Sequence, residues 1–287
     1  MAEGVASGIL GVMVENTARR LDAVGASSRA TYWGVVVLCV TLSVWLVLMA
    51  VSMLVRPGQP GAWGPWASTG AIIGGLAWLV VTATFHRNYL HVPVPDSRKV
   101  TVEPVGGLPS VVISWRTTFH RQPVFVAVVV VTAAAFVALA LHQIDQLLWW
   151  LPLVVVAPLL LALPDRTIEL VRPLRVVLNP LGVGVTGLGG DAWLDWDDIR
   201  RVEIEHESQW AVVRLAGSRA PESWHFARRA RFLHAPAPER PQLDVPGPAF
   251  PVDVQTVIDA LEHYCRTPAA RAELAGEAGR RRLLGEA

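Results

Sequence analysis

The stretch WLDWDDIRRVEI, residues 193–204, has three aspartates within two residues of Trp196. Asp195 and Asp197 form an Asp-x-Asp motif, which in many glycosyltransferases helps to hold a divalent cation, because hard cations prefer oxygen ligands. That use requires a nucleotide-binding α/β half ahead of the motif, whereas apolar blocks and short strands precede it here. Strand alternation instead places Trp196 on a buried face and leaves Asp197 and Asp198 at a turn or cap. The stretch therefore predicts the entry to a strand, and we expect no metal and no cofactor.

The run GVGVTG, Gly182 to Gly187, matches the GxGxxG pattern of dinucleotide-binding proteins. That fingerprint requires a helix to begin within it, but LGGDAWLDW follows and cannot start a helix. Asn179-Pro180-Leu181-Gly182 instead resembles a β-turn with Pro second and Gly fourth, which predicts a hairpin. The eight histidines are scattered, and no GxSxG, HExxH or P-loop motif is present. We expect no catalytic residues and a protein that is not an enzyme.

The elements around these motifs follow from the composition. Hydrophobic residues make up 52% of the 287 residues and charged residues only 17%, and the apolar excess is concentrated in blocks. This pattern is typical of a membrane protein. A formal net charge of +1 argues against a nucleic-acid partner. Lys99 is the only lysine among the 25 basic residues, a bias typical of a GC-rich bacterium such as an actinobacterium.

Four uncharged apolar blocks predict four transmembrane helices in two hairpins. A span needs roughly 20 apolar residues, and the first three blocks are long enough. The fourth is short and contains Pro152 and Pro158, but Trp149 and Trp150 at its start are typical interfacial anchors. The blocks are Tyr32–Val55, Ala67–Phe85, Pro123–Leu141 and Leu147–Leu163.

Basic residues predict the orientation. The connection 86–122 carries Arg87, Arg98, Lys99, Arg116 and Arg121, whereas the connections on the other side carry one basic residue or none. By the positive-inside rule, both termini and this loop are cytoplasmic, and we expect a multi-pass protein of the cell inner membrane.

Four segments are predicted along the chain. Residues 1–30 form an N-terminal cytoplasmic segment, either an interfacial amphipathic helix or a frayed helix with no role. Residues 31–164 form the four-helix transmembrane region with the cytoplasmic loop 86–122, whose hairpin KVTVEPVGGLPSVVISW either pairs with the later domain or rests on the bilayer. Residues 165–266 form a cytoplasmic domain of short strands followed by a helix with Asp253 as N-cap, and 267–287 form a C-terminal helical tail.

Five arginines are candidate contacts for a membrane surface or a partner. They are Arg200, Arg201, Arg228, Arg229 and Arg231. Each basic residue near an anionic surface contributes about 1 kcal/mol to docking, so a cluster could hold the domain against the membrane. The alternative is a solvated strand face.

The tail resembles the bacterial PH-like domains found on multi-pass membrane proteins of the actinobacterial type. The resemblance is carried by Trp196, Asp198, Ile199, Val202 and Ile204 after a Gly-containing turn. It implies a cytoplasmic α+β domain over roughly residues 165–265, a bent antiparallel sheet or barrel capped by a C-terminal helix. Inositol-lipid binding is not implied, because the loop 179–187 lacks arginine and lysine.

Two functions follow as expectations. The leading one is a non-enzymatic interaction, scaffolding or membrane-docking protein whose partners are the lipid bilayer and other membrane or cytoplasmic proteins, or further copies of itself. The alternative is a transporter or channel component that is regulated by its cytoplasmic domain. The apolar blocks favour the first, because coupled transporters normally keep ionisable groups within the bilayer and these blocks have none.

Overall fold

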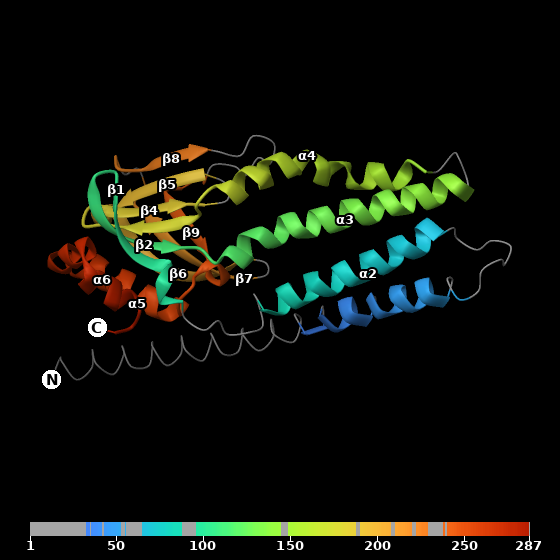
Figure 1. Ribbon diagram of the computed structural model, residues 1–287. Coiled ribbons are helices and arrows are strands. Elements are labelled where there is room, and N and C mark those ends of the chain that lie inside the picture. The colour runs from blue at the N-terminus through green and yellow to red at the C-terminus, as the bar shows by residue number, and fades with distance from the viewer. Residues whose placement is uncertain are drawn as a thin grey trace, which may run out of the picture.

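The computed structural model describes residues 33–34, 36–41, 43–52, 55, 65–87, 96–144, 149–187, 190–207, 210–219, 222–228, 238 and 240–286. In Figure 1, long helices lie side by side and extend from one side of a unit built from strands and short helices. We call the helices the helical layer; it comprises α2 (Pro65–Phe85), α3 (Thr117–Ile144), α4 (Leu151–Val171) and the described helical residues between 33 and 55. The predicted N-terminal segment 1–30 lies outside the described residues.

The rest of the described chain forms the sheet domain. Its strands are β1 (Val100–Val105), β2 (Leu108–Ser114), β3 (Arg175–Leu178), β4 (Gly182–Thr186), β5 (Gly190–Asp195), β6 (Ile199–Glu207), β7 (Trp210–Gly217), β8 (His225–Arg228) and β9 (Gln242–Pro246). Its helical segments are η2 (Ser97–Lys99), η3 (Trp196–Asp198), η4 (Gly247–Ala249), α5 (Val254–Arg266), η5 (Pro268–Ala275) and α6 (Glu277–Leu283).

The prediction of four transmembrane helices in two hairpins plus a cytoplasmic α+β PH-like domain is wrong. Among the described residues, one helix is long and apolar enough to cross a membrane, namely α2 over Ser68–Phe85. The apolar helical stretches Val36–Ser52 and Val124–Leu139 are shorter. In α4 the apolar run stops at Pro164, and the helix continues through Asp165, Arg166 and Glu169. The fourth predicted block ended at Leu163, but the helix that contains it runs on to Val171, so the limits of an apolar block are not the limits of a helix.

The strands also exceed the small domain that was predicted. The nine strands of the described residues form two antiparallel sheets, one in the order β1-β2-β3-β4-β5-β8 and one in the order β6-β7-β9. The larger sheet contains the hairpin β1–β2, which comes from the loop 86–122. Of the two alternatives for that hairpin, pairing with the later domain is the one found, because Val111 lies opposite Leu178 and Ser114 opposite Arg175.

Two tight turns set the register of the larger sheet. Gly106 and Gly107 join β1 to β2 with φ of 61° and 85°, values that favour glycine. At the β3–β4 turn, the Asn179 side-chain oxygen accepts hydrogen bonds from the backbone N–H of Leu181 (2.9 Å) and of Gly182 (3.0 Å). The hairpin predicted at Asn179 is confirmed, since β3 and β4 pair antiparallel across it.

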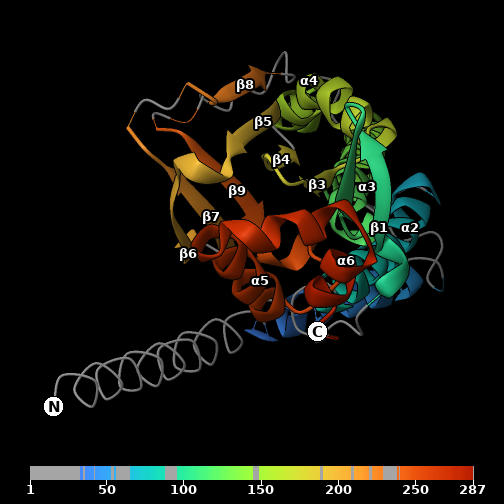
Figure 2. The same cartoon turned by 90° about the vertical axis from the view of Figure 1, so that its left-hand side faces the viewer.

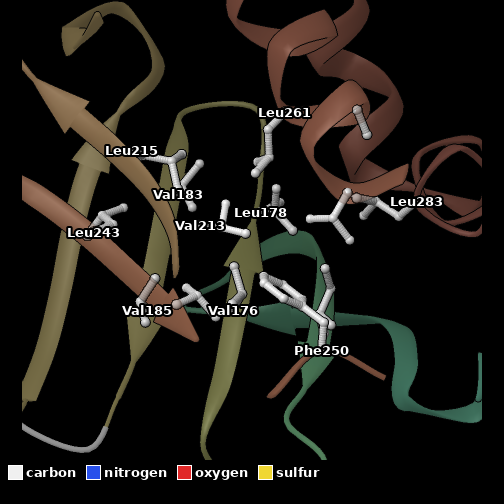
Figure 3. Close-up of a cluster of buried hydrophobic side chains, with 14 of the residues drawn as sticks. Val176, Leu178, Val183, Val185, Val213, Leu215, Leu243, Phe250, Leu261 and Leu283 are labelled. Carbon is white, nitrogen blue, oxygen red and sulfur yellow. The ribbon is translucent and has the colours of Figure 1, made fainter. Parts of the chain in front are cut away.

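One hydrophobic core lies between the two sheets and the C-terminal helices. Figure 3 shows side chains from β3 and β4, from β7 and β9, and from α5 and α6 pointing into the same cluster. Figure 2 shows α5 and α6 lying across the sheets at the end away from the helical layer. Leu274 and Leu283 are fully buried. The segment 267–287 therefore completes the core.

The helix α5 forms because apolar residues recur on one face and its first turn is capped. The Asp253 carboxylate accepts a hydrogen bond from Thr256 N–H at 2.9 Å, which confirms the predicted N-cap. Val257, Leu261 and Tyr264 occupy the buried face.

Candidate functional site

Large hydrophobic side chains are exposed mainly on the helical layer. In the sheet domain only Val102, Leu108 and Leu181 are in this class among the described residues. In α2, α3 and α4 the class comprises Ile73, Leu76, Val80, Phe125, Val128, Val137, Leu139, Leu151, Val154, Leu159, Leu160, Leu161 and Val171. Monomeric soluble proteins rarely expose contiguous apolar patches of this kind unless the patches are covered by a partner or lipid.

Charge is missing from the same surface. No Asp, Glu, Lys or Arg occurs in α2, in Pro123–Ile144 of α3 or in Leu151–Pro164 of α4. Over the span-length stretch Ser68–Phe85, 28% of residues are buried within the protein, whereas the core helix of a soluble protein is mostly buried. The exposed face is therefore apolar along the length of three neighbouring helices.

Aromatic residues lie at both ends of the helical layer. At the end near the sheet domain, the rings of Trp33 and His86 meet edge to face with centroids 5.1 Å apart. At the other end, His142 and Trp149 meet in the same way at 5.9 Å, and Trp150 beside them is 46% exposed. The stretch Ser68–Phe85 between these levels rises about 27 Å, close to the roughly 30 Å of a hydrocarbon core. Tryptophan at both boundaries is typical of membrane interfaces.

Glycines let the helices of the helical layer approach one another closely at two positions. A Cβ on Gly70 would lie 2.6 Å from the Phe136 side chain, and one on Gly75 would lie 2.8 Å from Val47, so these glycines allow the helices to approach. The buried hydroxyls of Ser43 and Thr82 donate to carbonyls of their own helix, at 2.7 and 2.8 Å.

A cavity of about 130 Å³ between α2 and α3 has Thr132 as its only polar side chain. The lining of this cavity has no ionisable side chain.

The five predicted contact arginines do not form one described cluster. Arg200 and Arg201 begin β6, where both are exposed and Arg201 donates to Glu203 at 3.0 Å. Arg228 pairs across strands with Gly190, the first residue of β5, whereas Arg200 lies beyond the other end of β5. Arg229 and Arg231 lie outside the described residues. Their contact with a membrane or partner stays a prediction.

Asp195, Asp197 and Asp198 each interact with a different residue of the sheet domain. Asp195 accepts a hydrogen bond from Trp193 Nε1 at 2.7 Å, and Asp197, whose side chain is 85% exposed, pairs with Arg271. Asp198 accepts a hydrogen bond from Ser223. Within the described residues, no three His, Cys, Asp or Glu side chains are grouped so as to hold a metal ion. Each carboxylate here helps to hold the fold.

Trp196 lies inside the core. Its side chain is 1% exposed, its Nε1 donates to the Asn179 carbonyl at 2.8 Å, and its ring lies 5.9 Å from that of Tyr264. The predicted burial of this residue is confirmed. It joins the β3–β4 turn to α5.

In the sequence, Arg116 was used only as one of the basic residues that predict the orientation of the chain in the membrane. In the structure it follows β2 and precedes α3, and its Nη1 atom is buried without a hydrogen-bond partner among the described residues. Burial, together with the nearby charge of Arg87, lowers the pKa of Arg116. Its local sequence, SWRTTF, carries no signal of this environment.

Comparisons with known proteins found no matching family model, no matching curated relative and no matching solved structure. The resemblance to PH-like domains stays a prediction.

Proposed function

We propose that this chain is a non-enzymatic membrane protein of a bacterial inner membrane, held by its helical layer, with the sheet domain as a cytoplasmic interaction module. The observation that carries the proposal is the uncharged, exposed apolar face of α2, α3 and α4. Lipid is the occupant that fits this face, because it extends over three helices and has tryptophans at both ends.

The proposed orientation rests on the positive connection between α2 and α3. Arg87, Arg98, Lys99 and Arg116 belong to it, and the sheet domain lies at the same end of the helices (Figure 1). The sheet domain is then cytoplasmic.

An interaction role for the sheet domain is supported by how its polar groups are arranged. The aspartates near Trp196 are engaged within the domain, and Arg200 in β6 exposes its positive charge on the surface. A transport role has no such support, because the cavity between α2 and α3 is apolar.

The test is fractionation of cells that produce the full chain, followed by an alkaline carbonate wash of the membranes. We expect the chain to stay in the carbonate-resistant pellet, because its buried apolar contacts with lipid do not depend on charge. Release into the supernatant would place the protein at the membrane surface or off the membrane and refute the proposal. An accessible-cysteine assay on an added C-terminal cysteine then reports whether the sheet domain is cytoplasmic.

A further inference from the structure

Three basic side chains gather where the sheet domain joins the helical layer. Arg116 lies between β2 and α3, and its backbone N–H donates to the Ala249 carbonyl at 2.8 Å, which fixes its backbone against η4. Lys99 ends η2, and its Nζ lies 3.4 Å from the Thr117 hydroxyl in the first turn of α3. Arg87 follows the end of α2, and its charge acts on Arg116. We call Arg87, Lys99 and Arg116 the basic junction.

Few acidic residues lie near the basic junction in the sequence. Between residues 65 and 164 the sequence has only Asp96, Glu103 and Asp145. Asp96 accepts from the backbone N–H of Arg98 as the cap of η2, and Glu103 pairs with Arg175 at 3.0 Å. Asp145 lies outside the described residues. Within the described residues, none of the three basic side chains forms an ion pair.

Of the three side chains of the basic junction, that of Arg116 has the most unusual environment. Its Nη1 is buried and has no acceptor among the described residues, although a buried guanidinium donor is normally paired. The same group is near a second cation, and its pKa is lowered by burial first and by that cation second. A group that is partly desolvated, unpaired and repelled is poorly placed for stability alone, and an arriving anion would supply the missing partner and offset both the repulsion and the cost of desolvation.

We propose that the basic junction binds a phosphate group. Arg116 supplies a planar guanidinium, which matches two phosphate oxygens, while Lys99 and Arg87 add charge and α3 contributes the positive end of its helix dipole. The proposal deepens the membrane role proposed above and rests on it for the choice of ligand source. The junction lies at the end of α2, at the level of Trp33 and His86, where the headgroup of an anionic phospholipid would be.

The experiment uses the purified full-length protein in a nonionic detergent and follows its thermal unfolding by tryptophan fluorescence. It is titrated at constant ionic strength with dihexanoyl-phosphatidylglycerol, with dihexanoyl-phosphatidylcholine and with inorganic phosphate. We expect a saturable rise in Tm with an anionic ligand and none with phosphatidylcholine, whose headgroup has no net charge. A response to phosphatidylglycerol at lower concentration than to phosphate identifies the lipid as the source, and the reverse identifies a soluble phosphate.

Arg116→Gln and Lys99→Gln test the residues, and Arg281→Gln is the matched control because it removes one exposed positive charge from α6. We expect Arg116→Gln to raise the half-saturating concentration about 10- to 100-fold, the range for a hydrogen bond to a charged group. Lys99→Gln should raise it less, and Arg281→Gln should not change it. Without ligand, the Tm of Arg116→Gln should equal or exceed that of the wild type, whereas a purely structural arginine would give a lower Tm.

The proposal is overturned if no anion raises the Tm of the wild type, or if the Arg116→Gln and Arg281→Gln curves coincide. Either result leaves the membrane role standing, since carbonate fractionation does not depend on this site. Conversely, if the chain leaves the membrane but still binds phosphate through Arg116, the membrane proposal fails and the phosphate site stands.

Discussion

Replacement of Leu76 by arginine tests whether the exposed face of α2 contacts lipid. Leu76 is 53% exposed and lies in the middle of the stretch Ser68–Phe85. In lipid, the change loses about 0.3–0.6 kcal/mol from leucine and adds about 2.5–3.5 kcal/mol for arginine at a helix centre. The sum of about 3–4 kcal/mol lowers the insertion equilibrium constant by about 100- to 1,000-fold.

Leu181→Arg is the matched control. Leu181 is 59% exposed at the β3–β4 turn of the sheet domain, where we expect water on its outer side. A surface substitution in water usually changes stability by less than about 0.5 kcal/mol. The two variants therefore make the same chemical change at similarly exposed leucines and differ only in the surrounding solvent.

The assay is the carbonate-resistant fraction of each variant, measured by immunoblot at matched synthesis, together with the yield of folded protein extracted in detergent. Leu76→Arg should lose most of its resistant fraction or be degraded, while Leu181→Arg should match the wild type. Equal behaviour of the two variants would mean that Leu76 faces water or another protein, and the assignment of α2 to lipid would be refuted.

Three further predictions concern the sheet domain, and each is read from unfolding of the purified protein. Trp196→Ala should lower the free energy of unfolding by about 3–5 kcal/mol because it empties a fully buried site. Trp196→Phe should lower it by about 1–2 kcal/mol because it removes the 2.8 Å hydrogen bond to the Asn179 carbonyl. Gly107→Ala should cost about 1–2 kcal/mol because φ is 85°, whereas Gly276→Ala, in extended backbone with open space around it, should be tolerated. Burial raises the pKa of Tyr264 to about 12, so as the pH rises the tyrosine of the unfolded chain ionises first, near pH 10. The free energy of unfolding should therefore fall by roughly 1 kcal/mol per pH unit between pH 10 and 12. Tyr264→Phe should lack this pH-dependent loss of stability.

The features that the sequence predicted correctly are local ones. The turn at Asn179 depends on four adjacent residues, and the cap of α5 depends on Asp253 and the next three residues. Trp196 was predicted to be buried because alternation along a strand separates it from its neighbours, although it lies in the short helix η3 at the strand entry. Patterns over a few residues carry enough information for such features.

The extent of the sheet could not be predicted in the same way. The pairing of β2 with β3 joins Ser114 to Arg175 across both α3 and α4, and no pattern within either strand specifies the other. The hairpin of β1 and β2 was recognised, but its two possible locations, on the sheet or on the bilayer, could be separated only by that long-range pairing. The candidate phosphate site was missed for the same reason, because Arg87, Lys99 and Arg116 come together only through packing.

The join between the two parts of the molecule has a mechanical consequence. Strand β2 leads into α3 through Trp115 and Arg116, and α4 leads into β3 through three residues. The two crossings are tied together, since Trp115 N–H donates to the Leu174 carbonyl at 2.9 Å, and Trp115 and Leu174 are both buried in the core. No flexible linker separates helices from strands at either crossing, so a movement of α3 relative to α4 must distort the β2–β3 pair. An anion bound at Arg116 would therefore act at the point where the helical layer and the sheet domain constrain each other most directly.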